Sequence, residues 1–161
     1  MAQDSENTLI LDLKTGPVKI ALRPDLAPAH VARIKELTRG GFYDGVVFHR
    51  VIPGFMAQTC DPTGTGSGGS DLPNLKAEFS SASHKRGTVS AARTANPNSA
   101  NSQFFICFAD APWLDRQYSI WGEVIEGMEH VDAIKKGGDH NNGQISGAPD
   151  KIVSMRVESD S

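Results

Sequence analysis

The chain has few cysteines, no long apolar run and no excess of basic residues, and each shortage excludes a class of protein. Its 161 residues include two cysteines, Cys60 and Cys107, too few for a disulfide framework, so we expect free thiols. No run of 18 apolar residues is present, which argues against a transmembrane helix. There are 16 basic and 19 acidic residues, giving a net charge of −3, so nucleic acid is not an expected partner.

The N-terminal residues also lack the features of a secretory signal. Residues 1–13, MAQDSENTLILDL, are polar and acidic, without a basic segment followed by an apolar one. We therefore expect a cytoplasmic protein that does not bind membranes. With 39% hydrophobic residues, residues 1–161 are expected to form a single domain with one core, about residues 8–157, and short polar tails.

Short apolar segments separated by turn residues predict a mostly β protein. A tight turn at Thr15-Gly16 is expected to join the first two strands. One helix is predicted to begin at Pro28 and end at Gly40-Gly41, and a second to cover residues 128–135. A short helical turn is expected at residues 112–115. The predicted strands are residues 8–14, 17–22, 46–51, 55–58, 87–91, 103–108, 120–124 and 152–157. So many short strands with two helices favour a closed antiparallel barrel.

The segment FHRVIPGFMAQ, residues 48–58, is apolar but carries His49, Arg50 and Gln58. An arginine cannot lose its charge, so a low-dielectric environment must give it partners or a ligand. A guanidinium held above Phe55 and Met56 is suited to bind something small and apolar that carries an amide. The segments SQFFICF, residues 102–108, and WLD, residues 113–115, have a similar character.

Simpler explanations exist for several of these residues. Arg50 alone could pair with a surface carboxylate, and Trp113 alone could be a packing residue. Phe104 and Phe105 are adjacent and point to opposite faces of a strand, so one of them belongs to the core. Asp115 and Glu123 are expected to be solvated or to stabilise turns rather than to act as acid–base groups.

Two other functional classes are disfavoured by the motifs. The Gly-rich segment PTGTGSGG, residues 62–69, resembles a phosphate cradle, but no Lys-Ser/Thr pair follows it and no βαβ unit surrounds it. His84, His130 and His140 are scattered without metal-ligand spacing. We therefore expect no metal and no cofactor.

Four separated blocks, in order, resemble the cyclophilins, the cyclosporin-binding class of peptidyl-prolyl cis-trans isomerases. They are GFYDGVVFHRVIPGFMAQ, PTGTGSGG, SQFFICFADAPWLD and WGEVIEGMEHVDAIKK. The likeness extends from about residue 8 to residue 157, and the segment AARTANPNSANSQFF is more similar to bacterial-type members. The resemblance implies a closed eight-stranded antiparallel β-barrel capped by two α-helices, with the site on the outer barrel face.

The resemblance also implies roles for individual residues. The implied catalytic residues are Arg50, Phe55 and Gln58. The implied substrate-binding residues are Met56, Gly64, Ala92, Arg93, Gln103, Phe105, Trp113, Leu114 and Tyr118. Two of these depart from common family patterns, because Tyr118 stands where many members have histidine and Arg93 where animal members usually have asparagine.

The activity that the resemblance implies is rotation about X–Pro peptide bonds, which would assist protein folding. The expected partners are proline-containing peptides and unfolded proteins, with cyclosporin as an inhibitor, and the protein is expected to be a monomer. Two alternatives remain open at this point. One is a proline-peptide binding module or chaperone whose turnover is incidental, and the other is a nucleic-acid accessory protein, which the acidic balance disfavours.

Overall fold

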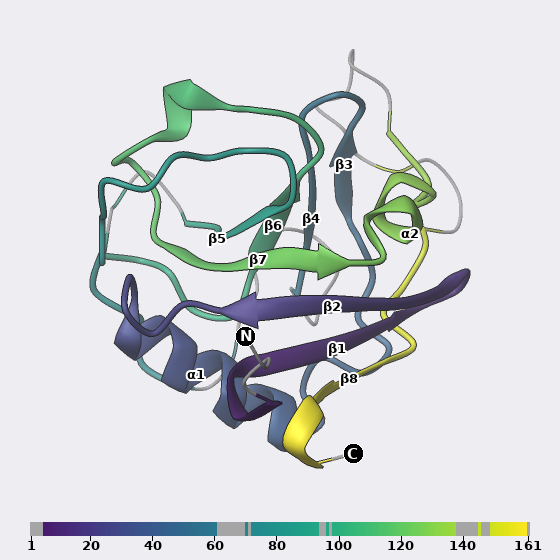
Figure 1. The fold of residues 1–161 in the computed structure, drawn as a ribbon, viewed down its shortest axis with the longest axis horizontal. Coiled ribbons are helices and arrows are strands. Elements are labelled where there is room, and N and C mark those ends of the chain that lie inside the picture. The colour runs from purple at the N-terminus through teal and green to yellow at the C-terminus, as the bar shows by residue number, and fades with distance from the viewer. Residues whose placement is uncertain are drawn as a thin grey trace.

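The computed structural model describes residues 5–60, 70, 72–93, 96, 98–137, 145 and 149–160 of the chain. Its eight strands form one antiparallel sheet (Figure 1). The strands are β1 (Thr8–Leu13), β2 (Gly16–Leu22), β3 (Arg50–Ile52), β4 (Met56–Thr59), β5 (Thr88–Ala91), β6 (Phe104–Cys107), β7 (Ile120–Glu126) and β8 (Ser154–Val157). The helices are α1 (Pro28–Arg39) and α2 (Met128–Asp132), with 3₁₀ turns η1 (Ser5–Asn7), η2 (Pro112–Leu114) and η4 (Glu158–Asp160).

The sheet curls into a half-barrel and is open, so the prediction of a closed barrel is wrong. The strand order is β3-β4-β6-β5-β7-β2-β1-β8, which leaves β3 and β8 as the two edges. These edges are linked just before each strand begins, through an isolated bridge between Val47 and Lys151. The backbone N–H of Phe48 donates to the Asp150 carbonyl at 2.8 Å, and the N–H of Ile152 donates to Val46 at 2.9 Å. The seam is therefore joined by loop segments and not by a strand ladder.

The same seam explains the largest error in the predicted strands. Residues 46–49 were expected to begin a strand, but β3 starts only at Arg50, because the backbone before it bonds across the seam. The β1–β2 turn also lies one residue earlier than expected, since Leu13 pairs with Gly16. Helix α2 ends at Asp132 rather than at Lys135. The other predicted elements are present within a few residues of their expected ends.

Helix α1 follows the spacing of its apolar residues. Val31, Ile34 and Leu37 are buried in the main core, as their shared face requires. Pro28 occupies the first turn, where its missing N–H costs nothing.

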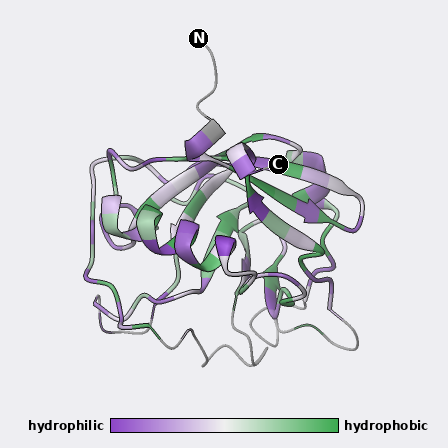
Figure 2. Cartoon of the chain, turned by 90° about the horizontal axis from the view of Figure 1, so that it is seen from below, coloured by the Kyte–Doolittle hydropathy of each residue, from purple (hydrophilic) through white to green (hydrophobic). Residues whose placement is uncertain are grey.

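The Glu78 carboxylate accepts bonds from the N–H groups of Ala29 and His30, at 3.2 and 2.9 Å. A side chain from a distant segment therefore caps the helix. Figure 2 shows hydrophilic and hydrophobic residues interspersed along the helices and strands, as two-faced elements require.

The ends of the described chain meet beside α1 in an ion-pair cluster. Glu6 accepts bonds from Arg39 at 2.9 Å and from Lys35 at 3.1 Å, and Arg39 also binds Asp160 at 2.9 Å. The Ser159 hydroxyl donates to Glu6 at 2.9 Å. The Arg39 guanidinium, with Ser159 and Lys35, lowers the pKa of Glu6 to about 2. η1 and η4 are thereby held to one helix.

This cluster predicts a dependence of stability on pH. A carboxyl whose pKa is lowered by folding adds stability above its unfolded pKa of about 4.3, and that stability is lost as the pH falls toward the folded value. The difference in melting temperature between wild type and Glu6→Gln should be constant above about pH 5. It should shrink as the pH approaches 2, the folded pKa of Glu6. A difference that does not change over this range would contradict the assignment.

Helix α2 packs closely on the β1–β2 hairpin. Gly127 precedes the helix with φ +84°, and a Cβ at this position would lie 2.4 Å from the Pro17 carbonyl oxygen. At the β1–β2 turn, the Thr15 hydroxyl is 2.9 Å from Nδ1 of His130 in α2. Among the described residues, neither helix has the length and hydropathy needed to cross a membrane.

Candidate active site

Four neighbouring strands place a row of residues across one end of the sheet. Arg50 on β3 is paired with Gln58 on β4, and Gln58 is paired with Phe105 on β6. Phe105 is in turn paired with Ser90 on β5. Because directly paired residues of a sheet point to the same face, these four side chains lie on one face. The row brings together segments that are separated by up to about a third of the chain length.

The polar end of this row is a short hydrogen-bonded chain. Arg50 Nη1 donates to Gln58 Oε1 at 3.2 Å, and Gln58 Nε2 donates to Gln103 Oε1 at 2.9 Å. Burial lowers the pKa of the Arg50 guanidinium, which nevertheless stays charged because the ordinary value is far above neutral pH. Gln58 therefore holds a cation beside an apolar surface. The Gln103 carbonyl also accepts the N–H of Ala92 at 3.0 Å.

A second apolar cluster, separate from the main core, surrounds Phe105. Its buried members are Met56, Ala92, Phe105, Cys107, Ala111 and Leu114, with Ile52, Phe55 and Tyr118 packed against them. Phe104, the neighbour of Phe105, lies in the main core instead. The alternation along β6 thus separates the two rings, and it places Cys107 on the same face as Phe105. We call this set the Phe105 cluster.

The turn η2 brings Trp113 and Leu114 to the edge of the Phe105 cluster. Leu114 is buried, whereas Trp113 remains 64% exposed. The Trp113 ring lies 5.6 Å from the Phe55 ring, at an angle of 45°. Phe55 is fixed by its backbone, since its carbonyl accepts the N–H of Phe108 at 2.8 Å. A large aromatic surface is therefore presented to solvent beside buried apolar residues.

Tyr118 and Arg93 close another side of the cluster. The Tyr118 ring meets Phe105 edge-on at 5.5 Å, and the Arg93 guanidinium carbon lies 4.6 Å from the centre of the Tyr118 ring. Arg93 Nε also donates to the Gln117 carbonyl at 3.0 Å. The cation is therefore stacked on the tyrosine and held to its neighbouring backbone. These are the two positions that the resemblance marked as departures from the usual family residues.

Sequence reasoning missed a polar pair behind the Phe105 cluster. His84 is buried, and both its backbone N–H and its Nδ1 lie near Asp115 Oδ1, at 2.6 and 3.1 Å. Burial lowers the pKa of His84, and the Asp115 carboxylate opposes that shift. The bond from the His84 N–H contributes most to the lowered pKa of Asp115. The Asp115 side chain bonds to the distant His84 rather than to its own turn. No local signal linked it to His84, which lies 31 residues earlier.

The structure brings together the predicted site residues that it describes. Gly64 lies outside the described residues. Both thiols are buried, and burial raises the pKa of Cys60 well above the ordinary value and that of Cys107 to about 12. They are therefore protonated at neutral pH and poor nucleophiles. Among the described residues, no group of three His, Cys, Asp or Glu side chains is arranged to hold a metal ion.

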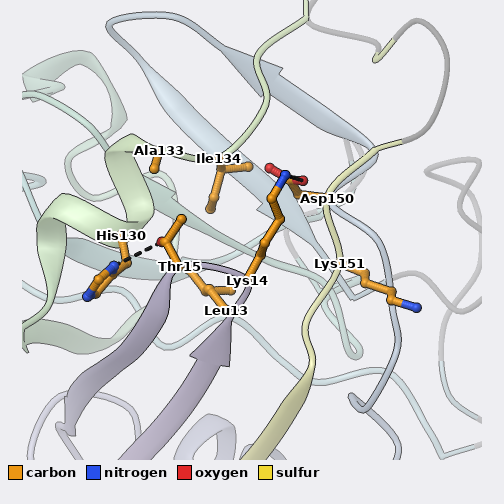
Figure 3. A pocket seen from close by; sticks show the side chains of 8 residues that line it. All are labelled: Leu13, Lys14, Thr15, His130, Ala133, Ile134, Asp150 and Lys151. Carbon is orange, nitrogen blue, oxygen red and sulfur yellow. Dashed lines mark hydrogen bonds and ion pairs between the residues drawn. The ribbon is translucent and has the colours of Figure 1, made fainter.

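A small hollow lies away from these residues, beside the β1–β2 turn (Figure 3). It is lined by Leu13, Lys14, Thr15, His130, Ala133, Ile134, Asp150 and Lys151. Lys14 Nζ lies 3.8 Å from Asp150 Oδ1, and Figure 3 shows its side chain extending toward that carboxylate. The cavity volume is about 20 Å³, room for about one water molecule. It shares no residue with the Phe105 cluster, which remains the better candidate for a peptide site.

Comparisons with known proteins identify the family to which the chain is similar. Residues 8–157 match the model of the family described as "Cyclophilin type peptidyl-prolyl cis-trans isomerase/CLD". A protein of Brucella suis named "Probable peptidyl-prolyl cis-trans isomerase" is 55% identical, over 99% of this chain and 86% of its own. The "Peptidyl-prolyl cis-trans isomerase-like 3" of Rattus norvegicus is 39% identical, over 80% of this chain and 82% of its own.

Two solved structures are similar throughout the fold. A cyclophilin from Hirschia baltica has a TM-score of 0.89 and 30% identity, covering 100% of this chain and 77% of its own. A cyclophilin-type isomerase from Cryptosporidium parvum, solved in the presence of the dipeptide Ala-Pro, has a TM-score of 0.84 and 27% identity. That match covers 93% of this chain and 98% of the other.

Proposed function

This chain belongs to the cyclophilin-type peptidyl-prolyl cis-trans isomerases and is an isomerase, and we propose that it turns X–Pro bonds over at the Phe105 cluster, beside Arg50. One observation carries this placement. The row of Arg50, Gln58 and Phe105 sets a fixed cation directly next to buried apolar side chains. A proline ring and its preceding amide need these two environments side by side.

The reaction needs no nucleophile, metal or general base, because no covalent bond is made or broken. The barrier of ~18–20 kcal/mol comes from the partial double bond of the amide, and the uncatalysed step takes ~10–100 s. Lowering that barrier by about 5.5 kcal/mol gives about 10⁴-fold acceleration. Such a gain requires that the site bind the twisted amide better than the planar one.

We assign the electrostatic part of this preference to Arg50. As the amide twists, its nitrogen loses conjugation and becomes a better hydrogen-bond acceptor. A guanidinium already fixed by Gln58 at 3.2 Å can donate to that nitrogen or to the neighbouring carbonyl without reorganising. Such a donor is worth most where water is excluded, and the apolar cluster next to it provides that surrounding.

The apolar part of the site would hold the proline ring. Met56, Phe105 and Leu114 are buried members of the Phe105 cluster, and Phe55 packs against them. We propose that they anchor the ring so that rotation occurs in the residues on one side of the bond. Met56 suits this role because a flexible thioether fills irregular apolar surface. Ala92, Arg93, Gln103, Trp113 and Tyr118 would line the path of the flanking peptide.

The partners that fit this site are proline-containing peptides and unfolded or flexible protein chains. The Ala-Pro dipeptide in the Cryptosporidium parvum structure supports this class of ligand. Because X–Pro isomerisation limits the folding of many chains, we propose that the protein assists folding in the cytoplasm, as a monomer.

An exchange experiment tests the placement of the site. Cis–trans exchange of a short Ala-Pro peptide is measured by NMR with a catalytic amount of protein, while the backbone signals of the protein are followed. We expect exchange to accelerate and the largest signal changes to fall on β3, β4, β6 and η2. Acceleration with the changes centred instead on the hollow beside the β1–β2 turn would contradict the proposed site.

Cyclosporin inhibition is a further proposal, and it rests on Trp113. This ring is 64% exposed and lies against Phe55, so it offers both apolar area and an N–H donor to a large apolar ligand. Saturating cyclosporin should abolish turnover of an X–Pro peptide. A Trp113→Phe variant should bind the drug about tenfold less tightly, equivalent to about 1.4 kcal/mol, as measured by calorimetry. Unchanged turnover at a saturating dose would contradict the proposal.

A further inference from the structure

The most heavily bonded imidazole in the described part of the protein lies directly behind the proposed proline site. His84 is 1% exposed, and four of its groups are hydrogen-bonded, two on the ring and two on the backbone. Its N–H and Nδ1 meet Asp115 Oδ1 at 2.6 and 3.1 Å, its Nε2 lies 3.1 Å from Ser90 Oγ, and its carbonyl accepts the N–H of Ala111 at 2.9 Å. Because both ring nitrogens and the adjacent backbone are bonded, the imidazole has one orientation.

The same ring supports the aromatic side of the Phe105 cluster. The His84 and Phe105 rings are stacked, 14° from parallel with centres 6.2 Å apart. Tyr118 meets the His84 ring edge-on at 6.4 Å and the Phe105 ring edge-on at 5.5 Å. The three rings therefore form one packed unit. Within it, the His84 ring is fixed by hydrogen bonds on both of its nitrogens.

The protonation state of the pair follows from its surroundings. Burial lowers the pKa of His84, so the ring is neutral near pH 7. Asp115 has a lowered pKa and is ionised, which makes it an acceptor only. The Nδ1 of His84 must therefore carry the proton and donate to Asp115, and its Nε2 accepts from the Ser90 hydroxyl. Every polar atom of the ring is satisfied, so the ring is rigid without carrying charge.

Asp115 also connects two separate segments of the chain that form the site. It directly follows Leu114 at the end of η2, while His84 precedes β5, which is paired with the Phe105 strand. One carboxylate thus ties the turn that carries Trp113 and Leu114 to the imidazole behind Phe105. A shift at either end would move side chains on both sides of the proposed ligand.

We propose that His84 and Asp115 are positioning residues for the isomerase reaction, because their hydrogen bond fixes the Phe105 and Tyr118 rings against which the proline turns. Neither residue touches the substrate in this assignment. The inference rests on the proposed function, since it takes the Phe105 cluster as the proline site. Misplacing groups by about 1 Å can cost about 10²-fold in rate, and a loosened ring is expected to move less than that.

The chain provides a matched control. His30 has the same arrangement on another carboxylate, with its N–H 2.9 Å and its Nδ1 2.6 Å from Glu78 Oε1. His30 is also 1% exposed, but this pair caps α1 and is not part of the Phe105 cluster. Removing either carboxylate breaks the same kind of buried contact, and only one of the two lies behind the proposed site.

The experiment compares Asp115→Ala, Asp115→Asn and Glu78→Ala for turnover of an X–Pro peptide, melting temperature and ring-proton NMR signals of Phe105 and Tyr118. We expect Asp115→Ala to lose about tenfold in kcat/KM and to shift these signals. Asp115→Asn should stay within about threefold of wild type, since an amide oxygen still accepts both His84 bonds. Glu78→Ala should lower the melting temperature while leaving turnover and the ring signals unchanged.

Three results would overturn the inference. One is an Asp115→Ala protein with wild-type turnover. Another is a Glu78→Ala protein that loses as much turnover as Asp115→Ala, which would show that the loss comes from lower stability alone. An Asn variant as inactive as the Ala variant would also contradict the hydrogen-bond basis. Arg50→Ala, assayed in parallel, separates this inference from the proposed function. If Arg50→Ala is inactive while Asp115→Ala keeps wild-type turnover, only the positioning role fails.

Discussion

Replacing Arg50 by alanine is expected to reduce kcat/KM for an X–Pro peptide by about 10²-fold or more. Loss of one preorganised donor from a desolvated site typically costs 10²–10³-fold, and Arg50 is the donor that Gln58 holds beside the Phe105 cluster. The measurement is a protease-coupled assay of cis-to-trans conversion, with circular dichroism to check the fold.

Two further variants define what is lost. Arg50→Lys keeps the charge but not the planar fork of donors, so it should recover only part of the turnover. Arg23→Ala removes an arginine that pairs with Asp25 at 2.9 Å outside the site, and it should be fully active. If Arg50→Ala remains within threefold of wild type, the electrostatic role proposed for Arg50 is wrong.

The same variant separates an enzyme from a binding module. Arg50→Ala leaves the apolar members of the Phe105 cluster in place, so peptide affinity, measured by calorimetry, should fall much less than turnover. If the role of the protein in cells survives this change, binding rather than turnover is what the cell uses.

The second large effect is expected at Gly127, which is not part of the Phe105 cluster. Gly127→Ala should lower the free energy of unfolding by about 3 kcal/mol. A positive φ of +84° is unfavourable for alanine, and the new Cβ would lie 2.4 Å from the Pro17 oxygen and 3.0 Å from Val18 Cα. Because these neighbours are backbone atoms of β2, they cannot rotate away. At 2–4 °C for each kcal/mol, the melting temperature should fall by about 6–12 °C.

Gly45 provides the control for the backbone conformation alone. Its φ is +79°, nearly that of Gly127, but no atom lies within 4 Å of the position that a Cβ would take. Gly45→Ala should therefore cost about 1 kcal/mol, or 2–4 °C. Equal losses of stability in the two variants would show that the close approach of Gly127 to β2 adds no cost to that of the backbone conformation.

Local patterns were enough to predict most of the elements. The spacing of Val31, Ile34 and Leu37 predicted the buried face of α1, and the adjacency of Phe104 and Phe105 predicted that only one of them would join the main core. These are consequences of helix and strand geometry and need no knowledge of the fold.

The sequence-based predictions that failed were those that depend on contacts between distant segments. Residues 46–49 have the composition of a strand, but their backbone bonds across the seam to residues 150–152. Sequence periodicity carries no information about such a partner. His84 and Asp115 were missed for the same reason, because each is unremarkable among its own neighbours. The roles of the site residues came from the resemblance, and the structure contributes their arrangement.

The open seam leaves two sheet edges, which matters for the proposed role in folding. A sheet edge with unpaired N–H and C=O groups can capture an extended chain as an added strand, which leads to aggregation. Here the edge strands β3 and β8 have three and four residues, and the Val51 carbonyl on β3 already accepts the N–H of Gly137 at 2.8 Å. Such short edges make a poor template for strand addition. If the proposed role in folding holds, the protein is thereby protected from co-aggregating with unfolded chains.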